Sequence, residues 1–262
     1  MKFLLFSIAL ASVGCSHNSH VSSHHKLKEV INSPSRTADY KTRDVYRHPL
    51  ETLEFFEIKS HHNVVEISPG GGWYTEILAP LVKDDGKLSL TIFDDNSPKD
   101  YKQRLNKKIK TNFPILSYVN FDEPNYQGPI GPDNSADRVL TFRNVHNWMK
   151  AGKLKQVLAS FNKVLKPGGI LGIVEHRANN KTKQDPKALS GYVREDYLIQ
   201  QVEAAGFEFV AKSEINANYL DTASHPEGVW TLPPSLRLKE KNKYKYLAIG
   251  ESDRMTLKFR KK

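Results

Sequence analysis

The sequence of 262 residues contains a single cysteine, Cys15, and this scarcity excludes one class of fold. One cysteine cannot form a disulfide within the chain, so a small disulfide-stapled protein is excluded. No internal repeat is evident, which argues against a solenoid. The roughly 247 residues that follow Cys15 are enough for one domain with a sizeable hydrophobic core.

An apolar run long enough to cross a membrane is also missing. The run at residues 3–11 has only about ten residues, follows Met1-Lys2 and ends in small residues, which is typical of a secretory signal. Cys15 directly follows Gly14 and resembles the cysteine of a bacterial lipobox, although Ser12 stands where an apolar residue is usual. The resemblance implies a lipoprotein signal peptide over 1–15, lipidation of Cys15, and an exported periplasmic protein anchored to the membrane.

Acidic residues are fewer than basic ones, 29 against 39, and the formal net charge is +10. Such a balance is compatible with anionic partners such as phospholipid or nucleic acid. The lysines are scattered, however, and no basic stripe is interleaved with aromatic residues. We therefore interpret the charge as a solvated cationic surface and do not expect a nucleic-acid partner.

Large apolar residues are sparse from Ser16 to Tyr40, where His, Ser, Lys and Asn predominate. This composition predicts a polar tether over 16–40, followed by a folded domain over 41–262, in which Pro49 begins a short helix. Two histidine pairs, at 24–25 and 61–62, lack further ligands at metal-site spacing. We expect no metal site there, and solvated side chains at 61–62.

Against this background, residues 64–76 carry the clearest signal. Val64-Val65-Glu66-Ile67 predicts a buried strand, Gly70-Gly71-Gly72 a tight turn, and the apolar stripe of 77–82 a helix. This geometry lets the backbone approach a nucleotide-like ligand with no Cβ in the way. A second predicted strand, 87–93, ends in Asp94-Asp95, where an acid can accept hydrogen bonds from ribose hydroxyls. The alternative is that both aspartates begin a solvated turn.

The segment Glu66 to Gly72 resembles motif I of the class I S-adenosylmethionine-dependent methyltransferases, acid-x-Gly-x-Gly-x-Gly. Glu66, Gly70 and Gly72 match, and Ser68 stands where the first glycine is usual. The resemblance implies that S-adenosylmethionine is the cofactor, with Gly70, Gly71 and Gly72 against its methionine part. By the same resemblance Glu66 lies near the cofactor's amino group, and Asp94 holds its ribose.

Two further residues join the predicted cofactor site. Asp122 follows the third predicted strand, where the family often has an acid beside the adenine; a simple loop acid is the equal alternative. Arg143 follows the fourth predicted strand and is included with the cofactor-binding residues.

The remaining elements alternate in the order that the family requires, over about residues 44–260. The predicted helices are 100–110, 154–165 and 194–205, and the predicted strands are 113–119, 136–142, 170–175, 207–211 and 254–259. Alternating strands and helices imply parallel pairing with right-handed crossovers. We therefore predict an α/β fold: a Rossmann-like, doubly wound, mostly parallel sheet of about seven strands with an antiparallel last strand.

The loop 143–148 is the predicted place of chemistry, because the crevice of such a sheet lies beyond the carboxyl ends of its strands. His146 has the intrinsic pKa of a general base, and Asn144 is placed to orient an acceptor. The alternative is that His146 and Trp148 only cap and pack the next helix. His176, after the fifth strand, is a competing base, while Tyr192 and Arg194 are better interpreted as ordinary loop polarity.

Two segments narrow the functional prediction. Residues 141–148 and 228–234 are similar to a poorly characterised branch of predicted methyltransferases, and the Asn/Asp-Pro-Pro-aromatic motif of amino-group methylation is absent after strand four. We expect a methyltransferase acting on a small molecule or an envelope component. Because an exported protein meets little of a cytoplasmic cofactor, the alternative is a non-catalytic envelope lipoprotein holding a nucleoside-like ligand. A cytoplasmic nucleic-acid methyltransferase is a third possibility and requires an uncleaved amino terminus.

Overall fold

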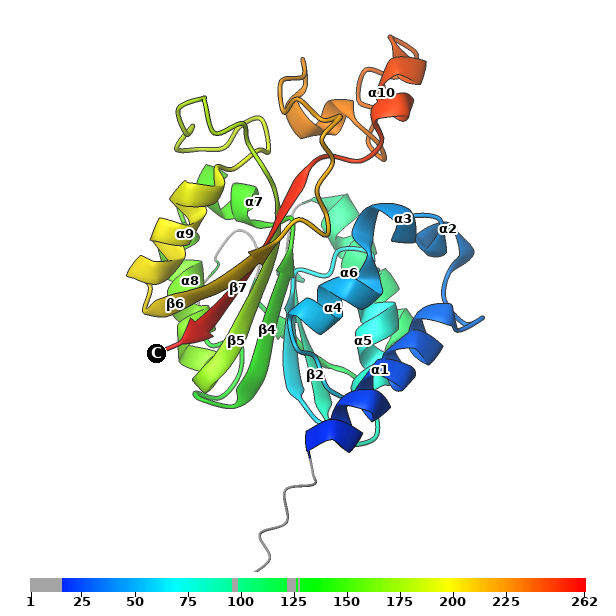
Figure 1. Ribbon diagram of the computed structural model, residues 1–262, viewed down its shortest axis with the longest axis vertical. Helices are drawn as coiled ribbons and strands as arrows, with labels where there is room; N and C mark the ends of the chain where they lie inside the picture. The colour runs from blue at the N-terminus through cyan, green and yellow to red at the C-terminus, as the bar shows by residue number, and fades with distance from the viewer. Residues whose placement is uncertain (1–15, 96–98, 122–125, 127) are drawn as a thin grey trace, which may run out of the picture.

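A computed structural model describes residues 16–95, 99–121, 126 and 128–262 of the chain (Figure 1). The predicted signal peptide, Cys15 and Asp122 lie outside these residues. Among the helices of the described part, none has the length and apolar character needed to cross a membrane.

Seven strands within the described residues form one sheet in the order β3-β2-β1-β4-β5-β7-β6. The strands are β1 (Asn63–Ile67), β2 (Lys87–Ile92), β3 (Ser117–Asn120), β4 (Ala136–Phe142), β5 (Leu165–His176), β6 (Phe207–Ser213) and β7 (Arg254–Lys261). The first five are parallel, while β7 runs antiparallel to both β5 and β6. The predicted fold class, including its antiparallel last strand, is confirmed.

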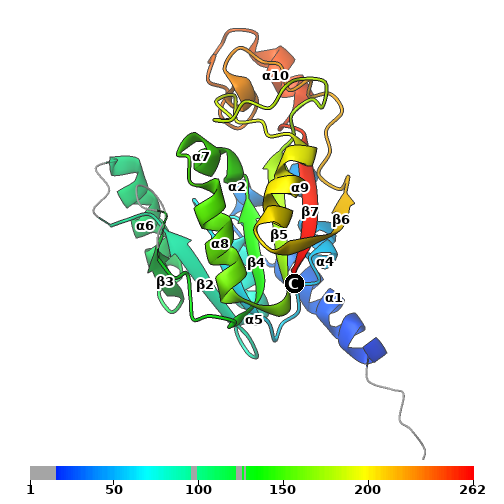
Figure 2. The same cartoon turned by 90° about the vertical axis from the view of Figure 1, so that its left-hand side faces the viewer.

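Helices cover both faces of this sheet (Figures 1 and 2). The helices of the described residues are α1 (Ser16–Asn32), α2 (Ala38–Lys41), α3 (Asp44–Arg47), α4 (Pro49–Phe55), α5 (Thr75–Val82), α6 (Asp100–Asn112), α7 (Val145–Lys150), α8 (Leu154–Val164), α9 (Glu195–Ala204), α10 (Lys243–Ile249) and the short 3-10 helix η1 (Gly228–Thr231). One apolar cluster joins α1, α4, α5 and α6 to the sheet, and a second joins α7, α8 and α9 to it. Each amphipathic helix thus buries its apolar stripe against a strand layer.

The segment predicted as a tether, 16–40, is instead ordered, and that prediction is wrong. Helix α1 packs against α4 and α5, and Leu27 is 2% exposed in the apolar cluster of that face. Val30 and Ile31 pack beside it, so the spacing i, i+3, i+4 forms a short apolar stripe within a polar stretch. The composition of the segment concealed this stripe.

Smaller differences concern element boundaries. The third predicted strand, 113–119, is confined to Ser117–Asn120, while β5 begins at Leu165 and not at residue 170. Leu165 pairs with Ala136 at an irregularity in the register, so the Pro-Gly-Gly sequence after α8 lies within the strand. His62, expected to be solvated, is only 7% exposed, and its Nδ1 accepts a hydrogen bond from the backbone N–H of Lys59.

The arrangement of strands positions the site. The parallel strands β1, β4 and β5 end at one edge of the sheet, and the segment that carries η1 and α10 gathers over this edge (Figures 1 and 2). Because β7 is antiparallel, it begins at the same edge, and Arg254 lies opposite His176 in the register. Residues far apart in the sequence therefore meet there.

Candidate active site

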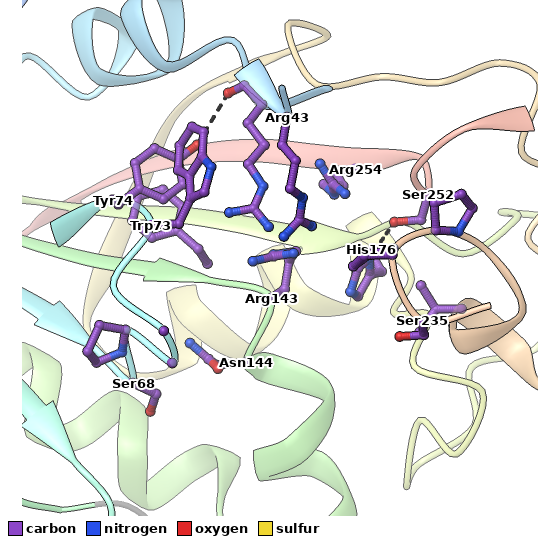
Figure 3. A pocket seen from close by; sticks show the side chains of 18 of the residues that line it. Arg43, Ser68, Trp73, Tyr74, Arg143, Asn144, His176, Ser235, Ser252 and Arg254 are labelled. Atoms are coloured by element: carbon purple, nitrogen blue, oxygen red, sulfur yellow. Dashed lines mark hydrogen bonds between the residues drawn. The ribbon is translucent and has the colours of Figure 1, made fainter. Parts of the chain in front are cut away.

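A cavity of about 300 Å³ lies at this edge (Figure 3). Its walls come from residues 40–47, the glycine turn, the ends of β4 and β5, the insertion around η1 and the start of β7. The cavity brings together, among the residues predicted from the sequence, Glu66, Gly70, Gly71, Arg143, Asn144, His146 and His176. Gly72 and Asp94 are not part of its lining.

The turn after β1 requires unusual backbone angles. Ser68 has φ of 49° and Gly70 φ of 58°, both in the left-handed region that favours glycine. This explains why the resembling motif usually has glycine where this chain has Ser68, whose backbone N–H donates to Thr91 Oγ1 at 2.9 Å. A Cβ on Gly70 would meet no atom within 4 Å, so the space above the turn is open.

Protein atoms lie close to the other two glycines. A Cβ on Gly71 would lie 2.5 Å from the hydroxyl of Tyr40, and one on Gly72 would lie 2.6 Å from Cδ1 of Ile109 in α6. The Tyr40 hydroxyl donates to the Gly71 carbonyl at 2.7 Å, and Trp73 Nε1 donates to the Tyr40 carbonyl at 2.8 Å. These two hydrogen bonds of Tyr40 hold the segment before α4 against the glycine turn.

Glu66 is a buried acid with little to balance its charge. The residue is 1% exposed, and Thr75 Oγ1 donates a hydrogen bond to Glu66 Oε2 at 2.7 Å. Burial raises the pKa of the Glu66 carboxyl to about 7, against the weaker opposing effect of the Thr75 hydrogen bond. Such a carboxyl is poised to ionise when a cationic group approaches it.

Asp94 and Asp95 lie beyond the end of β2, outside the cavity. Asp94 is half-buried, and its assignment to a ribose stays a prediction. Asp95 is engaged by Lys110 Nζ and by Asn106 Nδ2, each at 3.0 Å, and these hydrogen bonds help lower the pKa of its carboxyl. Asp95 is thus tied to α6.

His146 and Glu175 form a buried pair at the ends of neighbouring elements. His146 Nδ1 lies 3.1 Å from Glu175 Oε1, and Glu175 Oε2 accepts the backbone N–H of Val145 at 2.6 Å. When the carboxylate accepts a hydrogen bond from Nδ1–H, the proton stays on Nδ1, and the lone pair of Nε2 is free to accept another proton. This is the arrangement of a histidine base oriented by an acid. Sequence reasoning missed Glu175, which it placed in strand five without a role.

His176 lies beside this pair, with the two imidazole centroids 5.5 Å apart. Its Nδ1 lies 2.6 Å from Ser252 Oγ, and burial, followed by the charges of His146 and Arg254, holds its pKa well below the ordinary value. A lowered pKa disfavours proton uptake by His176, whereas the imidazole of His146 is oriented by the carboxylate of Glu175.

Asn144 and Trp148 contribute mainly to packing. Asn144 Nδ2 donates to the Ile67 carbonyl at 3.1 Å and to Thr141 Oγ1 at 3.2 Å, which joins the ends of β1 and β4. Asn144 also lines the cavity. Trp148 is buried against Phe161, with ring centroids 5.4 Å apart, as the packing alternative expected.

Tyr192 and Arg194 lie outside the cavity lining. The Tyr192 hydroxyl donates to Asp221 at 2.9 Å, and Arg194 pairs with Asp196 at the surface. These contacts agree with their interpretation as loop polarity.

Within the described part of the chain, His146, Glu175 and His176 have potential metal-ligand atoms within 4.8 Å of one another. The carboxylate of Glu175 already receives hydrogen bonds from the two backbone N–H groups of Val145 and His176, at 2.6 and 2.8 Å, besides its contact with His146. Arg143 and Arg254 also lie near enough to lower the pKa of His176, and they would repel a cation. The cluster is therefore better explained as a hydrogen-bonded base.

Several cavity residues were not among the site residues predicted from the sequence. Arg43 and Arg47 come from the segment before α4, and Trp230 comes from the insertion, where its ring lies 5.9 Å from that of His146. The insertion had been singled out by its similarity to a methyltransferase branch. The place of Arg254 follows only from the antiparallel register of β7.

Comparison with known proteins supports the fold and its class. No family model matches the chain. The chain is 28% identical over 127 residues to the ubiquinone/menaquinone biosynthesis C-methyltransferase UbiE of Pasteurella multocida, a match that covers 47% of this chain and 43% of that relative. The chain thus spans less than half the length of this curated relative.

Two solved structures extend the likeness over nearly the whole chain. The N-methyltransferase NodS of Bradyrhizobium japonicum, in complex with S-adenosylhomocysteine, superposes with a TM-score of 0.53 at 14% identity and covers 91% of this chain and 98% of its own. The [4+2]-cyclase SpnF superposes with a TM-score of 0.55 at 14% identity, covering 93% and 94%. At such identities the likeness establishes the Rossmann-like fold alone.

Proposed function

We propose that the protein is an S-adenosylmethionine-dependent methyltransferase whose acceptor is a small molecule. The observation that carries the proposal is the juxtaposition in one cavity of the acid-led glycine turn, Glu66 to Gly71, with His146, whose Nδ1 lies 3.1 Å from the buried Glu175. The first fits a cofactor that bears an ammonium group, and the second fits removal of a proton from an acceptor. The likeness to UbiE, a C-methyltransferase, points to the same class of reaction.

The residues present fit this cofactor. Glu66 is buried with a pKa of about 7, so an ammonium group beside it would be matched by a carboxylate that ionises on binding. Open space above Gly70 leaves room for the ligand at the turn. Glu66 and Gly70 would hold the methionine part, and Asp94, at the end of β2, would hold the ribose.

The proposed chemistry is an in-line displacement. When bound, S-adenosylmethionine supplies a methyl group on a sulfonium, and the electron pair of the broken C–S bond stays on sulfur. His146 Nε2 accepts the proton of an oxygen or nitrogen acceptor as the new bond to carbon forms, and Glu175 stabilises the resulting imidazolium. The surrounding residues supply proximity by holding acceptor and donor in one cavity.

The proposal also keeps the protein in the bacterial envelope, exported by residues 1–15 and anchored through lipid on Cys15. The support is the charged start, the short apolar run and the small residues before a lone cysteine. A methyl acceptor in the envelope, or a small molecule that passes through it, would then be the substrate.

The experiment has two steps. Calorimetric titration of the full chain with S-adenosylhomocysteine should give one site, and failure to bind at millimolar ligand contradicts the proposal. Next, envelope extract is incubated with S-adenosylmethionine that carries a labelled methyl group. Label should appear in a small molecule with wild-type protein and not with His146→Ala. Binding without any transfer would favour the non-catalytic ligand-binding alternative.

A further inference from the structure

Four arginines from separate parts of the chain converge on one wall of the cavity. Arg43 and Arg47 come from the segment before α4, Arg143 follows β4, and Arg254 begins β7. Figure 3 shows the guanidinium groups of Arg43 and Arg143 directed toward the same space, with Arg254 behind them. We call these four residues the arginine cluster.

Among the residues that the structure describes, one carboxylate, Glu251, pairs with the cluster. It accepts a hydrogen bond from Arg43 Nε at 2.5 Å and pairs with Arg254, while Arg47 Nε remains 3.9 Å from its Oε2. One negative charge thus faces four positive ones. Several buried nitrogens of the cluster have no hydrogen-bond partner among the described residues: Nε and Nη1 of Arg47, Nη2 of Arg43 and Nε of Arg254.

Arg47 shows the imbalance most clearly. Its side chain is 3% exposed; among the described residues its one ion-pair partner is Glu251, at 3.9 Å, and its guanidinium lies 4.6 Å from the centre of the Trp73 ring. Burial, followed by the charge of Arg143, holds the pKa of Arg47 well below its ordinary value, and burial with Arg254 lowers the pKa of Arg143 to about 10. Burying uncompensated cations costs several kcal/mol per ion, so the arrangement is unfavourable unless a ligand compensates it.

The other acids near the cavity, within the described part of the chain, do not supply that compensation. Glu66 receives its hydrogen bond from Thr75 on the far side of the glycine turn, and Glu175 is engaged by His146 and by backbone N–H groups. The excess charge therefore faces the cavity itself.

We propose that the arginine cluster binds an oxyanionic group, a carboxylate or a phosphate, carried by the molecule that accepts the methyl group. Guanidinium groups match both oxyanions through paired hydrogen bonds. The single carboxylate of the cofactor would neutralise one of the three excess charges and leave room for a second anion. This inference rests on the proposed function and makes the substrate an acidic small molecule whose anion lies beside the histidine pair.

The test uses inorganic phosphate and malonate as probes, titrated calorimetrically into the full chain at constant ionic strength, with and without saturating S-adenosylhomocysteine. The two probes distinguish a phosphate from a carboxylate preference. At least one of them should bind at one site, and saturation with S-adenosylhomocysteine should change its affinity by less than about threefold. Displacement of the anion by S-adenosylhomocysteine would overturn the proposal, because the cluster would then hold the cofactor's carboxylate and no second anion. Absence of binding by both probes would overturn it as well.

Arg47→Met is the decisive variant, because Glu251 keeps Arg43 and Arg254 when Arg47 is replaced. Anion affinity should fall at least about tenfold, as expected for losing a charged hydrogen bond. The unfolding temperature of the free protein should stay equal or rise, since an uncompensated cation is removed. A large fall in unfolding temperature with unchanged anion affinity would mark Arg47 as purely structural and contradict the proposal.

Arg260→Met is the matched control on the same strand as Arg254. Arg260 is half-exposed and pairs with Glu208 at the surface, so its replacement should leave anion affinity unchanged. If S-adenosylhomocysteine fails to bind while an anion binds and depends on Arg47, the proposed function fails and the anion site stands.

Discussion

Replacement of Glu66 by glutamine tests the cofactor site through two measurements of opposite sign. The carboxyl of Glu66 is buried, hydrogen-bonded to Thr75, and has its pKa raised from 4.5 to about 7. Glutamine keeps the shape and the possibility of the Thr75 hydrogen bond but cannot ionise. Glu66→Gln should therefore mimic the protonated acid at every pH.

The effect on stability follows from linkage. An acid whose pKa is higher in the folded state binds its proton more tightly there, so stability is lost as pH rises from 4.5 toward 7. With 1.36 kcal/mol per pH unit, the loss at pH 7.5 is about 3 kcal/mol. The free Glu66→Gln protein should thus be more stable than wild type at pH 7.5 by up to about this amount, and similar to it near pH 4.5.

The effect on binding has the opposite sign. The ionised carboxylate is the form that would hold the ligand's ammonium group, so wild-type affinity for S-adenosylhomocysteine should rise about eightfold from pH 6 to pH 7.5. Glu66→Gln should bind weakly at both values and lose this pH dependence. Urea unfolding and calorimetric titration measure the two quantities. A variant that is less stable at pH 7.5 and binds like wild type would refute the reasoning.

Four further outcomes are expected. His146→Ala should lower kcat about a hundredfold to ten-thousandfold, while binding of S-adenosylhomocysteine stays near wild type. If His146→Ala keeps the wild-type kcat and His176→Ala lowers kcat instead, the base is His176 at the end of strand five. Gly72→Val should lower the unfolding temperature for two reasons: its side chain would clash with Ile109 of α6, and the backbone φ of 86° at this position disfavours valine. Unchanged thermal unfolding would contradict this packing. Leu27→Ala should cost about 2–5 kcal/mol in urea unfolding, whereas a tether would lose nothing. In the native host, Cys15→Ser should abolish fatty-acid incorporation, and an unlipidated, unprocessed wild type would refute the anchor.

The sequence predicted the fold because its strongest patterns are local. The strand, glycine turn and helix after Val64 lie within twenty residues, and the apolar periodicity of each later element appears without knowledge of its partners. The same locality explains why Glu66, His146 and His176 were recognised as candidates: each lies within four residues of the carboxyl end of a strand.

The arginine cluster was not predictable in this way. Arg43 and Arg254 are separated by most of the chain and meet at Glu251 only because β7 runs antiparallel and begins at the carboxyl edge. Helix α1 was not predicted for a different reason: its apolar stripe around Leu27 is short and lies within a polar segment. Local sequence patterns predict individual helices and strands. The meeting of charged residues from distant segments can be predicted only when the register between strands is known.

The glycine turn gives a further example. The resemblance suggested that Gly72 is needed for ligand contact, whereas a Cβ there would meet Ile109 of α6. Ser68 looked like a departure from the motif, yet its positive φ shows that this chain adopts the backbone geometry that glycine usually supplies.

The most direct test of the central claim is a crystal structure of the protein with S-adenosylhomocysteine. The account predicts density above Gly70, with the ligand's amino group at hydrogen-bond distance from Glu66 and the ribose hydroxyls at Asp94, and with His146 facing the sulfur across the cavity. A ligand bound elsewhere, or an amino group remote from Glu66 at this turn, would contradict it.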